Sequence, residues 1–165
     1  METKQAGVRH VPPGEGRSIW IAGDTYTFKA VGADTNGALM LFDGTVSPQL
    51  GPPPHIHHRE DEFYYVLEGE LEILNGDSTF IASAGSFVHI PRGTLHRFKN
   101  VGATTARMLA FFTPAGMEGF FFEAGLPAQE GGSAPPFGPE EIERTLAAAP
   151  KYGMELPLPL GEQAA

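Results

Sequence analysis

Between residues 18 and 113 the sequence is a succession of short segments rich in β-branched and aromatic residues, separated by Gly, Pro and Asn. Segments of this length with alternating polar and apolar residues are typical of β-strands, whose side chains point in turn to two faces. We count about eight to ten such segments, joined mainly by tight turns. The pattern favours an all-β sandwich or barrel, and we predict a meander in which neighbouring strands pair antiparallel.

The two ends of the chain differ from this central part. Residues 1–17 have no periodicity, and we interpret them as an arm. Residues 116–125 have apolar residues at helical spacing, and a second helix is predicted from Pro139, with Ile142 and Leu146 as its apolar stripe. We therefore expect an N-terminal arm over residues 1–17 and one barrel domain over residues 18–114. Residues 115–165 are expected to form a helical and extended tail that packs on the barrel.

The composition excludes several classes of partner and site. The net charge is −9, with 20 acidic residues against 11 Lys and Arg, so a surface for nucleic acid or anionic membrane is not expected. The chain has no cysteine, which excludes disulfides, thiolate metal ligands and thiol catalysis. The polar N-terminus lacks an apolar signal core, and no apolar run has the length of a membrane span. We expect a soluble, cytoplasmic protein whose partner is a small molecule.

Possible metal ligands are concentrated between Gly51 and Gly69. His55 and His57 are two residues apart, so on a strand both imidazoles point to the same face. Glu62 follows after a short charged run, at the start of the apolar segment FYYVL. Three consecutive prolines precede His55 and hold the backbone extended. Two imidazoles and a carboxylate on one side of a sheet are most of a metal site.

A fourth ligand is available in the stretch from Gly85 to Asn100. His96 follows a Pro-Arg-Gly-Thr turn and begins a strand. If that strand pairs beside the one that carries Glu62, His96 completes a set of three imidazoles and one carboxylate.

These two stretches resemble the paired sequence motifs of the cupin superfamily. The first motif, H-x-H, three or four residues, Glu, six residues and Gly, is matched by His55, His57, Glu62 and Gly69. The second is matched at every position, by Gly85, Pro91, Gly93, His96 and Asn100. The family usually has a Gly separated from the first His by five residues, at the position where this chain has Gln49. The resemblance implies a double-stranded β-helix, or jelly-roll, barrel with one divalent transition metal per chain, held by His55, His57, Glu62 and His96.

Within the family, the arrangement is similar to bacterial quercetin dioxygenase-like cupins. That resemblance implies a metal-dependent dioxygenase acting on a small enolisable or phenolic molecule, with Glu62 also taking the proton from a substrate hydroxyl. Two alternatives remain: an isomerase, lyase or decarboxylase that uses the metal as a Lewis acid, and a barrel that binds a small molecule without catalysis. The ligand types suit Fe, Mn, Ni, Co, Cu or Zn and do not choose among them.

Several further residues have a predicted place. Three are candidates to line a hydrophobic substrate pocket beside the metal, although core packing is the favoured role for most of them: Tyr64, Phe98 and Met108. Residues 59–61 are interpreted as a solvated turn, in which Asp61 is a weaker alternative metal ligand. His58 is expected at the rim, and His89 in the core or behind the ligands.

The strand FYYVL has large apolar side chains on both faces. One face lines the barrel, and the other must be covered by the second sheet, by the C-terminal helices or by another subunit. We therefore predict a homodimer to whose interface the N-terminal arm or the C-terminal tail contributes.

Overall fold

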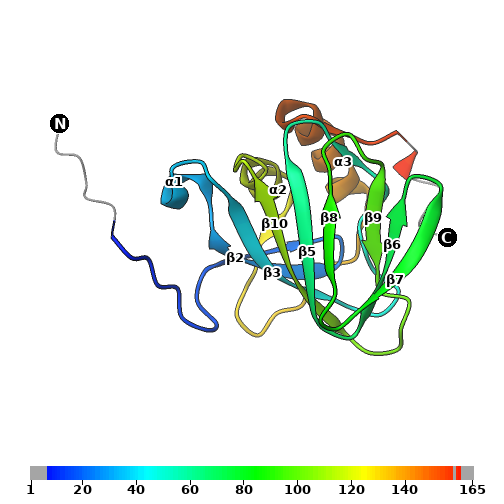
Figure 1. Cartoon of the computed structure of the whole chain (residues 1–165), viewed down its shortest axis with the longest axis horizontal. Helices are drawn as coiled ribbons and strands as arrows, with labels where there is room; N and C mark the ends of the chain where they lie inside the picture. The colour runs from blue at the N-terminus through cyan, green and yellow to red at the C-terminus, as the bar shows by residue number, and fades with distance from the viewer. Residues whose placement is uncertain (1–6, 158, 161–165) are drawn as a thin grey trace.

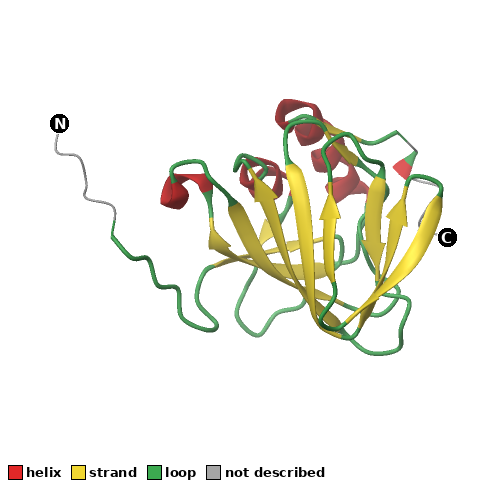
Figure 2. Ribbon diagram, viewed as in Figure 1, coloured by secondary structure: helices red, strands yellow, loops and turns green. Residues whose placement is uncertain are grey.

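A computed structural model describes residues 7–157 and 159–160 (Figure 1). Its strands form antiparallel sheets that curve into a barrel, which confirms the predicted all-β jelly-roll class (Figure 2). A seven-stranded sheet has the order β11 (Leu126–Pro127), β1 (Arg17–Ile21), β2 (Asp24–Ala30), β3 (Met40–Val46), β10 (Ala106–Thr113), β5 (Asp61–Glu68) and β8 (Phe87–Ile90). The two smaller sheets are β7 (Ser78–Ser83), β6 (Glu70–Asn75) and β9 (His96–Lys99), and β12 (Met154–Glu155) with β4 (Ile56–His57).

Two hairpins of the structure have two-residue turns. Ala22 and Gly23 link β1 to β2 with φ angles of 53° and 82°, the left-handed pair that a two-residue hairpin requires. Gly76 and Asp77 link β6 to β7, as the Asn-Gly-Asp signal predicts.

The remaining strand order corrects the predicted meander. β5 does not pair with β6, which follows it in the chain, but with β10 and β8. Gly69 lies between β5 and β6 with φ 75°, and a Cβ there would lie 3.1 Å from the Cα of Ala106. The chain therefore passes from one sheet to the other at this glycine. Pairing between strands distant in sequence lets both sheets bury their apolar faces against each other.

The barrel interior is filled with aromatic and aliphatic side chains. The rings of Tyr26 and Phe42 stack with centroids 4.3 Å apart, and Phe121 meets Phe42 edge-on at 5.4 Å. Aromatic pairs with such geometry stabilise a core beyond the area that they bury. Phe121 comes from the tail, so the core of the barrel includes residues that follow its last long strand.

The helices lie together at one end of the barrel (Figure 2). Besides the four-residue α1 (Gly32–Thr35), they are α2 (Glu118–Ala124), α3 (Pro139–Ala148) and the 3-10 turn η1 (Ala149–Tyr152). Helices α2 and α3 contact each other. The tail is also tied to the barrel by two short pairings, β11 with β1 and β12 with β4.

Helix α3 begins at Pro139, as predicted, but its buried stripe differs from the prediction. Its buried residues are Glu141, Thr145 and Ala148, whereas Leu146 is 52% exposed. Residues three and four apart share a helix face, so burying Glu141 turns Leu146 outward. The orientation follows from what the helix covers, namely a pocket at the barrel mouth, and not from its own apolar pattern.

Parts of the predicted arm and tail lie outside the described residues. They are residues 1–6 of the arm and residues 158 and 161–165 of the tail. Within the part of the chain that the structure describes, none of the helices has both the length and the apolarity to cross a membrane.

Candidate metal centre

Four side chains from distant parts of the sequence meet inside the barrel. One nitrogen from each of His55, His57 and His96 and one oxygen of Glu62 all lie within 4.8 Å of one another. All four residues are buried. The structure therefore brings together the full set of ligands that the two motifs predict, and this group is able to hold a metal ion.

The backbone around the first two histidines fixes their direction. His55 and His57 flank Ile56 and present their rings to the same side, as the spacing predicts. Gly51, ahead of the prolines, has φ 155°, and a Cβ there would lie 2.1 Å from the carbonyl oxygen of Phe98. Only glycine permits this approach, which lays the proline segment directly against β9.

His96 reaches the group by a different route from the one predicted. Its strand does not pair beside the strand that carries Glu62: β9 pairs with β6, while Glu62 on β5 pairs with Ile90 of β8. His96 instead forms a backbone bridge with His55. Glu62 then meets the three imidazoles across the barrel interior, from the opposite sheet. The side chains meet because the two sheets face each other, not because their strands are neighbours.

Two backbone carbonyls orient two of the imidazole rings. The Nδ1 of His55 donates to the carbonyl oxygen of Pro53 at 2.8 Å, and that of His96 donates to Thr94 at 2.9 Å. A carbonyl only accepts, so the proton is on Nδ1 and Nε2 of each ring is directed to the other ligands. Outer hydrogen bonds of this kind are typical of histidines that bind metals.

The hydrogen bonding within the group fits a bound cation. The Nδ1 of His57, whose residue is 3% exposed, has no hydrogen-bond partner among the described residues, and its Nε2 lies 3.2 Å from Glu62 Oε2 without forming a hydrogen bond. Such a buried, unpaired polar atom costs free energy, which a metal ion bonded to the nitrogen offsets. The Nε2 of His96 donates to Glu62 Oε2 at 2.6 Å, so a proton lies between two atoms that a metal ion would bridge in its place.

The charges in the group are set by burial and by mutual contact. Burial raises the pKa of Glu62, but the charge of His96, the hydrogen bond with His96 and the close approach of His57 hold that pKa below its usual range. Burial also lowers the pKa of His96, but Glu62 more than offsets this and raises it overall. The pKa of His55 is lowered well below normal by burial and by the two other imidazoles. The group thus combines an ionised carboxylate with a neutral imidazole, a set that attracts a divalent metal.

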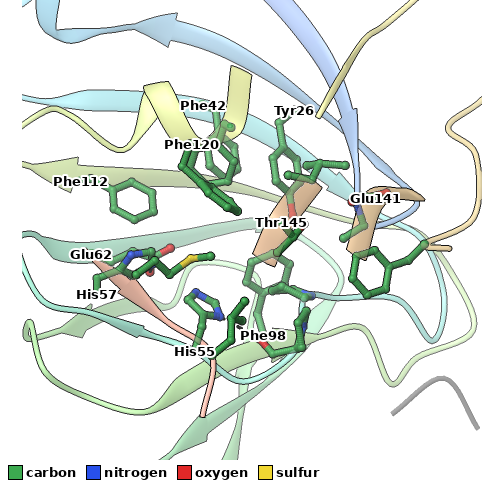
Figure 3. A pocket seen from close by; sticks show the side chains of 18 residues that line it. Tyr26, Phe42, His55, His57, Glu62, Phe98, Phe112, Phe120, Glu141 and Thr145 are labelled. Atoms are coloured by element: carbon green, nitrogen blue, oxygen red, sulfur yellow. Dashed lines mark hydrogen bonds and ion pairs between the residues drawn. The ribbon is translucent and has the colours of Figure 1, made fainter. Parts of the chain in front are cut away.

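A pocket opens onto this group from the helical end of the barrel (Figure 3). Its empty space is about 570 Å³, including open solvent at the mouth. Three of the four ligands, all except His96, form part of its wall. The ring of Phe112 meets that of His57 edge-on at 5.0 Å. Most of the other lining side chains are aromatic or aliphatic, among them Tyr26, Phe42, Phe98, Phe120, Phe121 and Phe137.

Comparison with known proteins identifies the family. A family model described as a cupin domain matches residues 43–112, the segment that contains all four predicted ligands. This chain belongs to the cupin superfamily.

Curated relatives and solved structures show what this cupin is similar to. It is 42% identical over 82 residues to polyketide synthase CurC of Streptomyces cyaneus (48% of this chain, 53% of that protein). It is 27% identical over 122 residues to quercetin 2,3-dioxygenase of Aspergillus japonicus (69% and 34%). The structure of the polyketide cyclase RemF of Streptomyces resistomycificus superposes with a TM-score of 0.57 at 25% identity, covering 65% of this chain and 80% of that one. The cupin thus spans about half or less of the curated relatives that it matches.

The predicted substrate-lining residues are only partly in the pocket. Phe98 lines it. Tyr64 and Met108 are wholly buried and are not among the residues that line the pocket. Both point inward, from β5 and β10, but they are packed in the core between the sheets, where the favoured interpretation places them.

The other histidines and the charged run have different surroundings from the ligands. His58 is exposed at the rim, as predicted, and bonds Glu155 at 2.7 Å. His89 is not in the core: it is on the exposed face of the sheet, stacked on Phe63 at 4.8 Å. This correction arises because β8 alternates, and Val88 and Ile90 take the inward positions.

The two acidic residues before Glu62 also separate. Asp61 points away from the metal group and accepts hydrogen bonds from Arg92 at 2.9 Å and from His89 at 3.2 Å, so it is not a ligand. Glu60 is buried and not part of a solvated turn, and burial raises its pKa to about 7. Alternation along β5 explains both positions, because Glu60 and Glu62 lie on the same inward side.

Sequence reasoning missed the polar residues at the far side of the pocket. Glu141 and Thr145 of α3 line it, and so does Phe137 in the segment before that helix. Acidic residues in the first turn of a helix are usually explained by their favourable interaction with the helix dipole. Glu141 was therefore not recognised as a residue of the pocket. The available signal was the spacing of four between two polar residues on a helix with few large apolar side chains.

Proposed function

We propose that this cupin is a metal-dependent enzyme that acts on flat aromatic molecules with an enolisable or phenolic hydroxyl, most closely a dioxygenase. The observation that carries the proposal is the position of the ligand group, which forms one wall of a pocket whose other walls are largely aromatic. A substrate held between aromatic rings then presents an edge oxygen to the ligands. Small carboxylate anions fit less well, because no lysine or arginine is among the described residues that line the pocket.

The residues of the chain have separate tasks in this proposal. Phe98, Phe112 and Phe120 contact the faces or edges of the substrate and exclude water, which strengthens the electrostatic interactions near the ligands. The carboxylate of Glu62 is held ionised and accepts the proton of the substrate hydroxyl. His55, His57 and His96 supply imidazole nitrogens. A transition metal bound to these four residues supplies Lewis acidity and, when it is redox-active, a route for electrons.

The dioxygenase class is supported by the likeness to quercetin 2,3-dioxygenase. In such a reaction both atoms of dioxygen enter the organic product, and the deprotonated substrate supplies all the electrons. No external reductant is then needed. An electron-rich hydroxylated ring system that loses a proton to Glu62 meets this requirement.

A second candidate is a ring closure of a polyketide without dioxygen. The names of CurC and of RemF both concern polyketides, and the chain resembles CurC at the higher identity. The same pocket and the same base suit an enolisable polyketide chain. In this alternative the metal acts as a Lewis acid only.

Oxygen consumption by the purified, metal-loaded protein tests the first candidate. With a flavonol as substrate we expect uptake of one dioxygen per substrate, and loss of that uptake when His55 and His57 are both changed to Ala. Metal-dependent conversion of a polyketide substrate without oxygen uptake would favour the cyclase class. A protein that binds no transition metal under any expression condition would contradict both enzymes and favour a binding barrel.

A further inference from the structure

Helix α3 buries polar side chains and leaves an apolar one in water. Glu141 and Thr145 are 6% and 5% exposed, whereas Leu146 on the same helix is 52% exposed. This orientation of α3 is unfavourable for two reasons. The buried polar groups lose their contact with water, and the exposed leucine does not gain the free energy of burying an apolar side chain. Departures of this kind from the usual pattern of apolar burial are expected at positions that serve function.

Glu141 has a structural bond that uses only one of its oxygens. Its Oε1 accepts the backbone N–H of Ala22 at 2.7 Å, which ties α3 to the β1–β2 turn. Within the described residues the structure shows no hydrogen bond for its Oε2 or for the hydroxyl of Thr145, and neither atom is among the fully enclosed polar atoms that lack a partner, so both remain open to the pocket. The anchoring bond therefore explains why an acceptor is present at position 141, but not why the side chain has a second oxygen or why Thr145 lies beside it.

The two side chains lie at the end of the pocket away from the ligand group. Both line the pocket, and Figure 3 shows Glu141 on the side opposite His57 and Glu62, with Thr145 between. Between the two polar ends the lining is mostly apolar. The pocket thus has a polar group at each end of an aromatic slot.

We propose that Glu141 and Thr145 determine specificity, by hydrogen-bonding a hydroxyl group at the end of a polyhydroxylated aromatic ligand that lies farthest from the metal centre. The inference rests on the proposed function, whose substrate class it makes more specific. A carboxylate accepts a hydrogen bond from a hydroxyl group and repels a second carboxylate. The ligand therefore presents a neutral phenol or alcohol at this end.

Two related flavonols test the inference by binding alone. The protein is loaded with Zn²⁺, which is redox-inert, and titrated without dioxygen with quercetin or with 3-hydroxyflavone. Both compounds carry the hydroxy-ketone that faces the ligand group, but only quercetin has hydroxyls on the remaining rings. We expect the wild-type protein to bind quercetin about tenfold more tightly, the effect of one or two added hydrogen bonds.

Two near-isosteric variants then remove the distal interactions. Glu141→Gln keeps an acceptor for Ala22 and replaces only the second oxygen, and Thr145→Val removes only the hydroxyl. Each is expected to weaken quercetin binding about three- to tenfold and to change 3-hydroxyflavone binding less than about twofold. Glu140→Gln, on the exposed face of the same helix, is the matched control and should change neither.

The outcomes separate this inference from the proposed function. Equal binding of the two flavonols by the wild-type protein, or equal losses for both in the variants, would overturn the specificity role and leave the aromatic substrate class standing. If the zinc-loaded wild-type protein bound neither compound, the proposed function and this inference would both be overturned. Melting temperatures of the variants show whether each one is folded.

Discussion

His55 and His96 are joined by two reciprocal backbone hydrogen bonds, each 3.0 Å long, and their rings lie 4.4 Å apart. The bridge fixes the two motifs of the sequence in register, so that a ligand from each one is held by the backbone of the other. Because the ring of each residue is also oriented by a carbonyl, little side-chain freedom is lost when a metal binds. The ligand group is therefore largely preorganised.

Metal binding should stabilise the folded protein through His57. At a metal concentration 100-fold above the Kd, binding to the folded state adds about 2.7 kcal/mol to the free energy of unfolding. We expect this gain in the wild-type protein and its loss in His57→Ala, because the ring nitrogens of His57 contact no polar group outside the four ligands and form no hydrogen bond among the described residues. Thermal denaturation with and without added metal measures the effect.

The neighbouring histidine is the control for that experiment. His58 is exposed and bonds Glu155 at the rim, so His58→Ala should keep the full metal-induced gain. Equal loss of the gain in both variants would show that the metal binds outside the buried group.

The pH dependence of the metal-free protein should follow His96. Its pKa is raised in the folded state, so its hydrogen bond to Glu62 contributes stability below the unfolded pKa of about 6.5, and that contribution is lost as pH rises through the folded value. Glu62 has a lowered pKa, and its contribution is lost only as pH falls below its unfolded value of about 4.3. We therefore expect denaturant unfolding to show stability that decreases above about pH 6.5.

Metal affinity should change with pH in the opposite sense. The proton on Nε2 of His96 must leave before a cation binds there, so affinity should rise as pH increases. Competition with a chelator at several pH values measures this. The metal-free His96→Gln variant should no longer lose stability above about pH 6.5. If the stability of that variant still decreased there, the pH dependence would belong to another group.

Local features of this fold were predictable from the sequence, and its pairing was not. The Gly76–Asp77 turn and the start of α3 at Pro139 follow from residue chemistry within a few positions. The pairing of β5 with β10 instead depends on which apolar faces meet across the barrel, and no local pattern encodes that. The orientation of α3 depends in the same way on the pocket beneath it.

The ligand group was predictable because its spacing is local, while the rest of the site was not. His55, His57 and Glu62 lie within one short stretch, and the second motif supplies His96. The pocket wall, in contrast, collects single residues from strands, loops and α3. Glu141 reaches it only because the tail folds back over the barrel mouth. Long-range placement of this kind leaves no periodic trace in the sequence.

Gly51 should be more sensitive to substitution than Gly85, although both have a positive φ. A Cβ at Gly51 meets the carbonyl oxygen of Phe98 at 2.1 Å, while a Cβ at Gly85 has nothing within 4 Å. The cost of a left-handed conformation, about 1–2 kcal/mol, applies to both alanine variants. In Gly51→Ala the backbone clash adds to it and displaces the segment before His55.

Denaturant unfolding and metal titration of the two alanine variants test this difference. We expect Gly85→Ala to retain wild-type metal affinity, and Gly51→Ala to lose at least about 3 kcal/mol of stability, a large effect for one substitution, together with much of its metal affinity. Equal costs in the two variants would show that the chain relaxes away from Phe98 and that the close approach does not position His55.

The predicted homodimer should form through the outer face of β5 and β8. Phe63 stacks there on Phe111 with centroids 5.4 Å apart, and Phe87 is 59% exposed beside it. An exposed aromatic cluster of this kind on a sheet is expected to be covered by another protein surface.

Light scattering coupled to gel filtration should therefore give twice the mass of the chain. Phe87→Glu should shift the protein to monomer because it places a charge within the contact. Leu146→Glu, which changes an exposed apolar residue on α3, is the matched control and should leave the dimer intact. A wild-type protein that runs as a monomer would contradict the prediction, and dissociation by Leu146→Glu alone would move the interface to the helical end of the barrel.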